Sequence, residues 1–299
     1  MKKIIYFLVI ISILSLTFYY KEDILVYYDK YLSKIIHVPT TLEVNNYYRE
    51  YNFKYVSNTI NFNPKNKQDI LNIYYTVINS GMDNFTFYCD STYLTCINDV
   101  TDIANNQNTI SNINNFVHPY NGFKNLETEI DSLGKITLKI KHNYTDEMKI
   151  ILDYKVDEII NKLITNDMTN REKIKTIHDY IINNTKYDYL RSDENIINYK
   201  SDTAYGVLIE GYGLCGGYTD SMMLFLEKFN IKSYKIASSN HVWNYVYLDN
   251  NWYNLDLTWD DPVNKNHTDE LDDSFFLISD EELKKLDSKE HNFDKNVYG

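Results

Sequence analysis

The chain has 299 residues, and 43% of them are hydrophobic, which allows one or two compact domains with a substantial core. Its 42 acidic residues outnumber the 30 lysines and arginines and give a net charge of −12. This balance argues against a nucleic acid as the natural partner, because phosphate binding needs a basic surface. It does not favour adhesion to an anionic membrane surface either, and it leaves the oligomeric state open.

The N-terminal residues 1–21 combine a basic flank with an apolar run. Lys2 and Lys3 precede the 17 mostly apolar residues 4–20. A segment of this kind predicts export or anchoring. Its length is at the short limit for spanning a bilayer, and it ends without a clear Ala-x-Ala cleavage site. We therefore expect a signal anchor in the membrane rather than a cleaved signal peptide. In either case the body of the protein would face outward from the cell membrane or be secreted.

Two regions of different character follow the apolar run. Residues 22–65 are polar and aromatic-rich, and we expect them to form a juxtamembrane segment. Residues 66–164 are predicted to form a small α+β N-terminal region, which is either a domain of its own or an extension packed against the core. Hydrophobic periodicity and capping residues predict these elements: a helix over 69–80, a strand over 85–89, an irregular Asn-rich stretch over 105–115, a turn over 119–122, a strand over 135–141 and a helix from 146 to about 164.

The three cysteines divide into a pair and a single residue. Cys89 and Cys96 lie seven positions apart and could close a small loop as a disulfide outside the cell. They would be within bonding range if 85–89 and 94–96 were the two arms of a hairpin. That pairing leaves Cys215 as a free thiol. No Cys or His cluster has the spacing of a zinc site and no phosphate-binding glycine loop is present, so we predict neither a metal nor a cofactor.

The C-terminal part, 165–299, begins with a helix signal. Thr169 and Glu172 form a capping box that predicts a helix to about residue 183. His178 lies on the apolar side of this helix and is interpreted as a core histidine with satisfied hydrogen bonds. His291 falls in a polar segment near the C-terminus and could approach Cys215, although nothing in its spacing requires this.

Three residues of this part have the chemistry of an activated cysteine nucleophile. Cys215 lies in Gly-Tyr-Gly-Leu-Cys-Gly-Gly-Tyr, directly ahead of an apolar run, and His241 and Asp256 follow it in the chain. A histidine can take the proton of a thiol, and a carboxylate can hold the histidine in the required tautomer. A helix that begins at the cysteine would place its positive end beside the sulfur and favour the thiolate.

The spacing of the histidine and the aspartate predicts that they meet on a β-hairpin. Residues 242–248 and 252–257 are rich in Val, Tyr, Trp and Leu, and Asp249-Asn250 between them tolerates the positive φ of a two-residue turn. With Leu248 opposite Asn251, the two site residues share one face on a diagonal and are within reach of each other. A register slip of one residue would place them on opposite faces.

Three sequence blocks together resemble the core of the transglutaminase-like superfamily, over roughly residues 170–280. They are the block around Cys215, His241-Val-Trp-Asn, and Trp252-Tyr-Asn-Leu-Asp-Leu-Thr-Trp-Asp-Asp-Pro. The resemblance implies an α+β fold with a papain-like core in 165–299, where the cysteine helix packs on an antiparallel sheet that carries His and Asp. It also implies that Cys215 is the nucleophile, His241 the general base and acid, and Asp256 the orienting carboxylate.

The same resemblance implies a function class. The expected substrate is a peptide or protein amide, attacked through a thioester that is resolved by water or by an amine, so that the product is either hydrolysed or cross-linked. The alternative is a catalytically silent surface module that kept the fold for binding.

Overall fold

The computed structural model of the chain describes residues 2–21, 23–24, 42–90, 92–131, 134–262 and 271–298. Helix α1 (Lys2–Tyr19) coincides with most of the predicted apolar run. In the described part of the chain no helix is both long and apolar enough to cross a membrane. Much of the predicted juxtamembrane segment, 25–41, lies outside the described residues.

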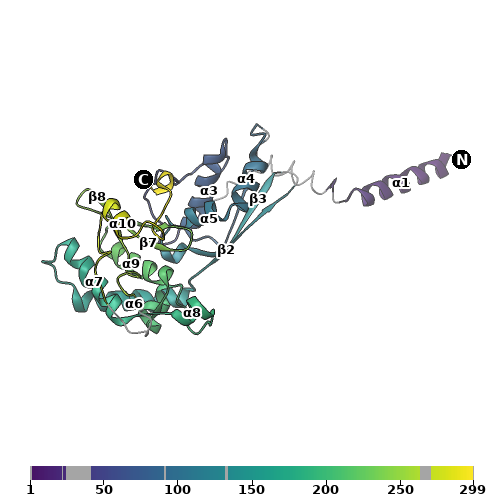
Figure 1. Cartoon of the computed structure of the whole chain (residues 1–299). Helices are drawn as coiled ribbons and strands as arrows, with labels where there is room; N and C mark the ends of the chain where they lie inside the picture. Colours follow the sequence, from purple (N-terminus) through teal and green to yellow (C-terminus); the bar gives the residue numbers. More distant parts are fainter. Residues whose placement is uncertain are drawn as a thin grey trace.

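The N-terminal region is built on a three-stranded antiparallel sheet with the strand order β1–β3–β2. Three helices pack beside this sheet (Figure 1). The strands and helices have the following bounds: β1 Asn84–Tyr88, β2 Phe123–Ile130, β3 Lys135–His142, α3 Lys67–Ser80, α4 Cys96–Asn105 and α5 Gln107–Asn114. The predicted helix over 69–80 and the strands over 85–89 and 135–141 are confirmed. The turn predicted over 119–122 contains a short 3₁₀ helix, Pro119–Asn121.

Two elements of this region differ from the prediction. The Asn-rich stretch was expected to be irregular, but it forms α5, because the side chain of Asn106 caps the helix by accepting from Thr109 N. Ile110 and Ile113 then provide a buried face for this helix. Strand β2 was not predicted, because its sequence FKNLETEI is mostly polar. In the structure none of its side chains is fully buried.

Cys89 and Cys96 form the predicted disulfide bond, with their Cα atoms 5.7 Å apart. The hairpin proposed to bring them together is wrong. Cys89 directly follows β1, whereas Cys96 is the first residue of α4. The bond therefore ties a sheet edge to a helix start, and Cys215 is the free thiol among the three cysteines.

Thiol titration in denaturant without reductant is expected to find one free thiol per chain, and the Cys215→Ala variant is expected to show none. Reduction of the bond should lower the free energy of unfolding by about 2 kcal/mol, because it releases a short loop in the unfolded chain. Three reactive thiols before reduction would contradict the disulfide.

The C-terminal part carries a second antiparallel sheet with the order β6–β7–β8. The predicted helices on either side of residue 165 are both present, because Thr145 caps α6 at the end of the N-terminal region and the capping box of Thr169 and Glu172 opens α7. The principal elements from residue 146 onward are α6 Asp146–Leu163, α7 Asn170–Asn184, β4 Lys186–Tyr187, α8 Tyr189–Glu194, β5 Tyr212–Gly213, α9 Cys215–Lys228, β6 Ser233–Ala237, β7 Val242–Leu248, β8 Asn251–Leu255, α10 Asp280–Leu286 and α11 Lys295–Tyr298.

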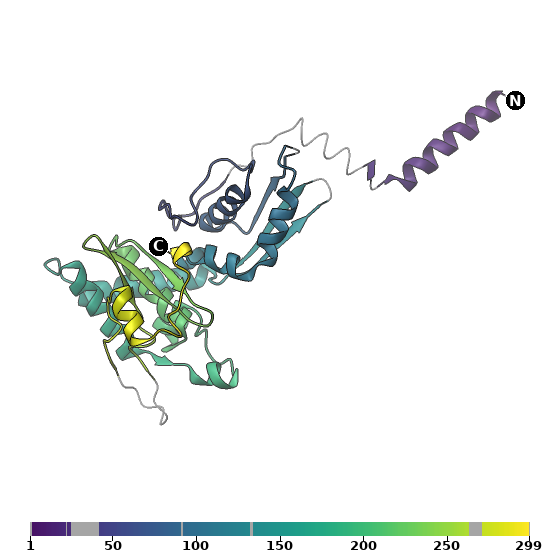
Figure 2. The same ribbon diagram turned by 45° about the horizontal axis from the view of Figure 1, so that its top comes forward.

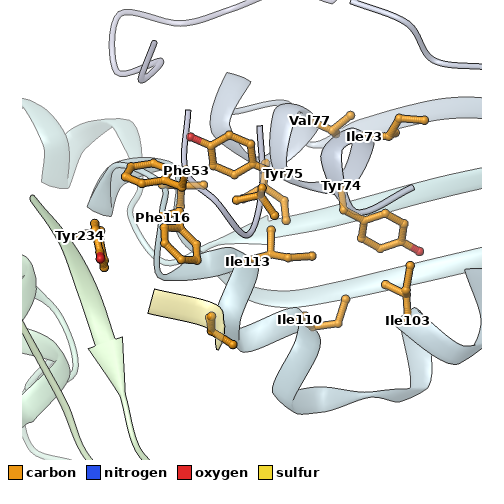
Figure 3. Close-up of a cluster of buried hydrophobic side chains, with 14 of the residues drawn as sticks. Phe53, Ile73, Tyr74, Tyr75, Val77, Ile103, Ile110, Ile113, Phe116 and Tyr234 are labelled. Carbon is orange, nitrogen blue, oxygen red and sulfur yellow. The ribbon is translucent and has the colours of Figure 1, made fainter. Parts of the chain in front are cut away.

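Both faces of this second sheet are covered. Helix α9 packs on one face, where Val246, Leu248 and Leu255 are buried. The opposite face enters an aromatic cluster that it shares with the N-terminal region. In Figure 3 the ring of Tyr234, from β6, lies beside the rings of Phe53 and Phe116.

The N-terminal region is therefore packed directly against the sheet, as one of the two alternatives allowed. Arg49 strengthens this contact, because its buried guanidinium donates to the backbone carbonyls of Ser233 and Phe116. Figure 2 shows the yellow C-terminal end of the chain beside the helices of the N-terminal region. The domain boundaries at 65/66 and 164/165 remain predictions.

Candidate active site

Cys215 is the first residue of α9, at the position that the sequence predicted. The residue before it, Leu214, is extended, and its N–H donates to the carbonyl of Ser201 at 2.9 Å. The first N–H groups of a helix have no partner inside the helix, and they form its positive end. The half-buried thiol of Cys215 therefore lies beside several backbone donors that can stabilise negative charge.

Glycines near the cysteine allow close packing, and Gly217 lets the loop 200–203 approach the start of α9. A Cβ atom at Gly217 would lie 2.2 Å from the carbonyl oxygen of Ser201 and 3.0 Å from that of Thr203. A Cβ atom at Gly213 would lie 2.7 Å from the ring of Tyr218. The glycine-rich sequence around Cys215 thus reflects close backbone contacts that fix where the helix begins.

His241 and Asp256 meet as the hairpin predicted. Asp249 and Asn250 have φ values of 50° and 63°, and the strand pairing begins with Leu248 opposite Asn251. The ladder ends one residue before Asp256. Just beyond it, His241 Nε2 lies 2.5 Å from Asp256 Oδ2. The two side chains are 6% and 1% exposed, so this contact is shielded from solvent.

The imidazole of His241 links the thiol to the carboxylate. Since its Nε2 faces Asp256, Nδ1 is the nitrogen left to interact with the Cys215 side chain. Burial alone would lower the pKa of His241. The negative charge of Asp256, the hydrogen bond to it and the contact with Cys215 outweigh burial and raise that pKa to about 10. His241 is therefore charged at neutral pH.

Asp256 is held by donors at both of its oxygens. Oδ1 accepts the backbone N–H groups of Thr258 at 3.0 Å and Trp259 at 3.3 Å, while Oδ2 faces His241. Burial alone would raise the pKa of this carboxyl. The charge and hydrogen bonds of His241 and His291 outweigh burial and lower it to about 2. The site therefore contains a buried, ionised carboxylate in a fixed orientation.

His291 also contacts this carboxylate, although the sequence assigned it no role. Its Nε2 lies 2.9 Å from Asp256 Oδ2, and its Nδ1 lies 3.0 Å from Asp287 Oδ2. The His291 side chain is fully buried. Its partner lies 35 residues earlier in the chain, and no sequence pattern links the two positions. The structure thus brings a fourth side chain to the three that the sequence predicted.

His178, by contrast, fits its interpretation as a satisfied core histidine. It is fully buried on α7, and its Nε2 lies 3.0 Å from Asp260 Oδ2. Its Nδ1 lies 2.9 Å from Asp179 Oδ1. These contacts tie α7 to the segment that follows β8 and leave no ring nitrogen of His178 for the site.

One group of side chains has the composition of a metal site. One ligand atom from each of His241, Asp256 and His291 lies within 4.8 Å of the other two. Those atoms already pair with one another through hydrogen bonds, and an ion would have to replace the protons they share. The observed distances fit a hydrogen-bonded chain.

Comparison with known proteins agrees with this geometry. Residues 157–257, which include all three predicted site residues, match the transglutaminase-like superfamily. No curated protein matches the chain significantly. A solved structure described as the crystal structure of a TGase is 18% identical, with a TM-score of 0.34. The match covers 46% of this chain and 45% of that chain, so less than half of the solved protein is represented.

The family match and the architecture agree on the fold class. The described residues form an α+β fold in which the helix that begins with Cys215 packs on the antiparallel sheet β6–β7–β8. This is the papain-like arrangement that the sequence blocks predicted. Residues 157–257 of the chain are accordingly a transglutaminase-like domain.

Proposed function

We propose that the protein is a cysteine acyl-transfer enzyme that attacks peptide or protein amides through a thioester. The observation that carries the proposal is the arrangement of Cys215 at the positive end of α9, of His241 beside it, and of Asp256 hydrogen-bonded to His241. Transglutaminase-like domains act on protein substrates in general, which supports the substrate class. A module that only bound a partner would not need a thiol, an imidazole and a carboxylate in contact.

The geometry suits a two-step reaction. The Cys215 sulfur, as thiolate, attacks the amide carbonyl, and backbone N–H groups in the first turn of α9 stabilise the oxyanion. The C–N bond then breaks, His241 gives its proton to the leaving amine, and a thioester remains. In the second step His241 takes a proton from water or from a primary amine as it attacks the thioester. Water completes hydrolysis, whereas an amine produces a cross-link.

The proposal includes a location outside the cytoplasm. The Cys89–Cys96 disulfide supports it, because such bonds persist in oxidising compartments and are rare where thiols are kept reduced. The free Cys215 is compatible with the same compartment, since the other two cysteines are bonded to each other. The protein would thus be secreted or act at the cell surface.

Mass spectrometry with an activated ester tests the proposed chemistry. After incubation with p-nitrophenyl acetate and an acid quench, the intact protein should gain one acetyl group, and peptide mapping should place it on Cys215. The Cys215→Ala variant, which removes only the sulfur, should gain none. An unmodified Cys215 in folded protein would contradict the proposal and favour the binding module.

A second measurement then distinguishes the two outcomes of the thioester. A protein substrate rich in exposed glutamine is incubated with the enzyme and a fluorescent primary amine. Incorporation of the amine indicates cross-linking, whereas release of ammonia without incorporation indicates hydrolysis. Both reactions should be absent in Cys215→Ala.

A further inference from the structure

We propose that His291 is a positioning residue that holds Asp256 against His241, so that the hydrogen-bonded chain of the site has a fourth member. This inference rests on the proposed function, since it assigns His291 a part in the same acyl-transfer reaction. His291 contacts Asp256 and Asp287 by hydrogen bonds. It is therefore placed to act on the reaction through Asp256.

The partners of His291 define what it does chemically. Ionised carboxylates only accept hydrogen bonds, so a ring nitrogen that faces one must carry a proton. Nε2 of His291 faces Asp256 and Nδ1 faces Asp287, at 2.9 and 3.0 Å. Both nitrogens consequently donate. His291 therefore directs an N–H at Asp256 Oδ2, the same oxygen that accepts the hydrogen bond from His241. Asp256 Oδ2 thus lies between two imidazole rings and cannot rotate away without losing both bonds.

The surroundings of His291 leave its ring a single orientation. The ring stacks on Phe275, with centroids 5.2 Å apart and an angle of 17° between the planes. Trp243 and Trp259 meet it edge to face, each with centroids 4.9 Å apart. A polar ring in such an apolar enclosure is costly unless it is hydrogen-bonded, which makes the two carboxylate contacts obligatory.

The segment that carries His291 is fixed at both ends. At its start, Asp287 Oδ2 accepts the backbone N–H groups of Glu290 and His291, which forms a closed turn. At its end, the hydroxyl of Tyr298 accepts a hydrogen bond from Asn115 Nδ2 at 2.6 Å. Asn115 belongs to the N-terminal region, whose helices lie beside the C-terminal end of the chain in Figure 2. The N-terminal region therefore helps to hold the residue that orients the site.

Two substitutions separate the N–H of His291 from its bulk. His291→Phe keeps a flat ring for the aromatic enclosure but removes both donors. His291→Gln keeps an N–H near the position of Nε2. His142→Gln is the matched control, because His142 lies in β3 of the N-terminal sheet and forms no hydrogen bond with the site. Each full-length variant is assayed with p-nitrophenyl acetate for kcat and KM, and its thermal unfolding is recorded.

We expect His291→Phe to lower kcat by about 10- to 100-fold with KM little changed. Removing the hydrogen-bond partner of a metal-binding residue has an effect of this size in metalloenzymes. His291→Gln should recover most of that loss, and His142→Gln should match the wild type. A merely structural role would lower both His291 variants in proportion to their stability.

The outcomes distinguish this inference from the proposed function. Wild-type kcat in a folded His291→Phe variant, or equal loss in a folded His291→Gln variant, overturns the inference while the acylation of Cys215 stands. If the wild type itself is not acylated, the proposed function and this inference both fall. If both variants unfold, ¹⁵N NMR of histidine-labelled wild type decides, because a bare Nε2 on His291 would overturn the inference.

Discussion

Asp256→Asn is expected to fold normally and to lower kcat for acyl transfer by about 10⁴-fold, the loss caused by this change in a comparable triad. The structure explains why. Two backbone N–H groups, from Thr258 and Trp259, point at Oδ1, so the amide oxygen of the variant would occupy that position. Its NH₂ group would then face His241 Nε2, which would have to accept. The single proton of the neutral His241 ring would then lie on Nδ1, the nitrogen that faces Cys215. That nitrogen could not accept the proton of the thiol.

The same variant should change the titration of His241. In the wild type burial lowers the pKa of His241, and the charge of Asp256 more than offsets this, so that the pKa is about 10. A neutral amide removes that charge and leaves only the contact with Cys215 to oppose burial, so His241 should lose its proton at a lower pH. In the wild type, the stabilisation from the charged pair is fully present below the ordinary histidine pKa of about 6.5 and is lost as the pH rises through about 10.

NMR of the histidine ring protons measures this titration directly, and the kinetic assay uses the same activated ester as above. Circular dichroism and thermal unfolding show whether the variant is folded. Full activity, or a His241 titration unchanged from the wild type, would refute the role of Asp256 as the orienting carboxylate. Loss of the fold would indicate that Asp256 serves the hairpin rather than the chemistry.

The parts of the site that follow from short-range sequence were predictable, and those that depend on distant packing were not. The hairpin that joins His241 to Asp256 depends on a two-residue turn and on alternating side chains, which are both local. The start of α9 at Cys215 likewise follows from its glycines and the apolar run after it. His291 reaches Asp256 only because the C-terminal segment is held by Asp287 and Tyr298.

The misjudged elements of the N-terminal region have the same explanation. Strand β2 has alternating but mostly polar side chains, and it is a strand because β3 offers it hydrogen-bond partners along its length. Helix α5 depends on a single cap, Asn106, and on two isoleucines that meet a core assembled from other segments. Neither signal stands out in an asparagine-rich sequence.

Lys235→Met is expected to lower the free energy of unfolding by about 3–5 kcal/mol, the usual cost of removing one partner of a buried ion pair. Lys235 Nζ lies 2.7 Å from Asp220 Oδ1, and the side chains are 11% and 4% exposed. Asp220 belongs to α9 and Lys235 to β6, so the pair fixes the cysteine helix on its sheet. Without the ammonium group, the Asp220 carboxylate would keep the hydrogen bond from Tyr144 but would remain charged in a place that water barely reaches.

The control is a second ion pair on the same helix. Lys228 Nζ also lies 2.7 Å from its partner, Asp157, but the two side chains are 40% and 55% exposed. Lys228→Met should therefore cost less than about 1 kcal/mol, because water already screens the charges and solvates whichever is left. Urea unfolding of both variants compares a buried and an exposed pair at equal distance. Equal losses would show that burial does not set the energy of the Lys235–Asp220 pair.

Adding Asp220→Asn to Lys235→Met should restore part of the stability, since it removes the uncompensated charge and retains a group that Tyr144 can bond.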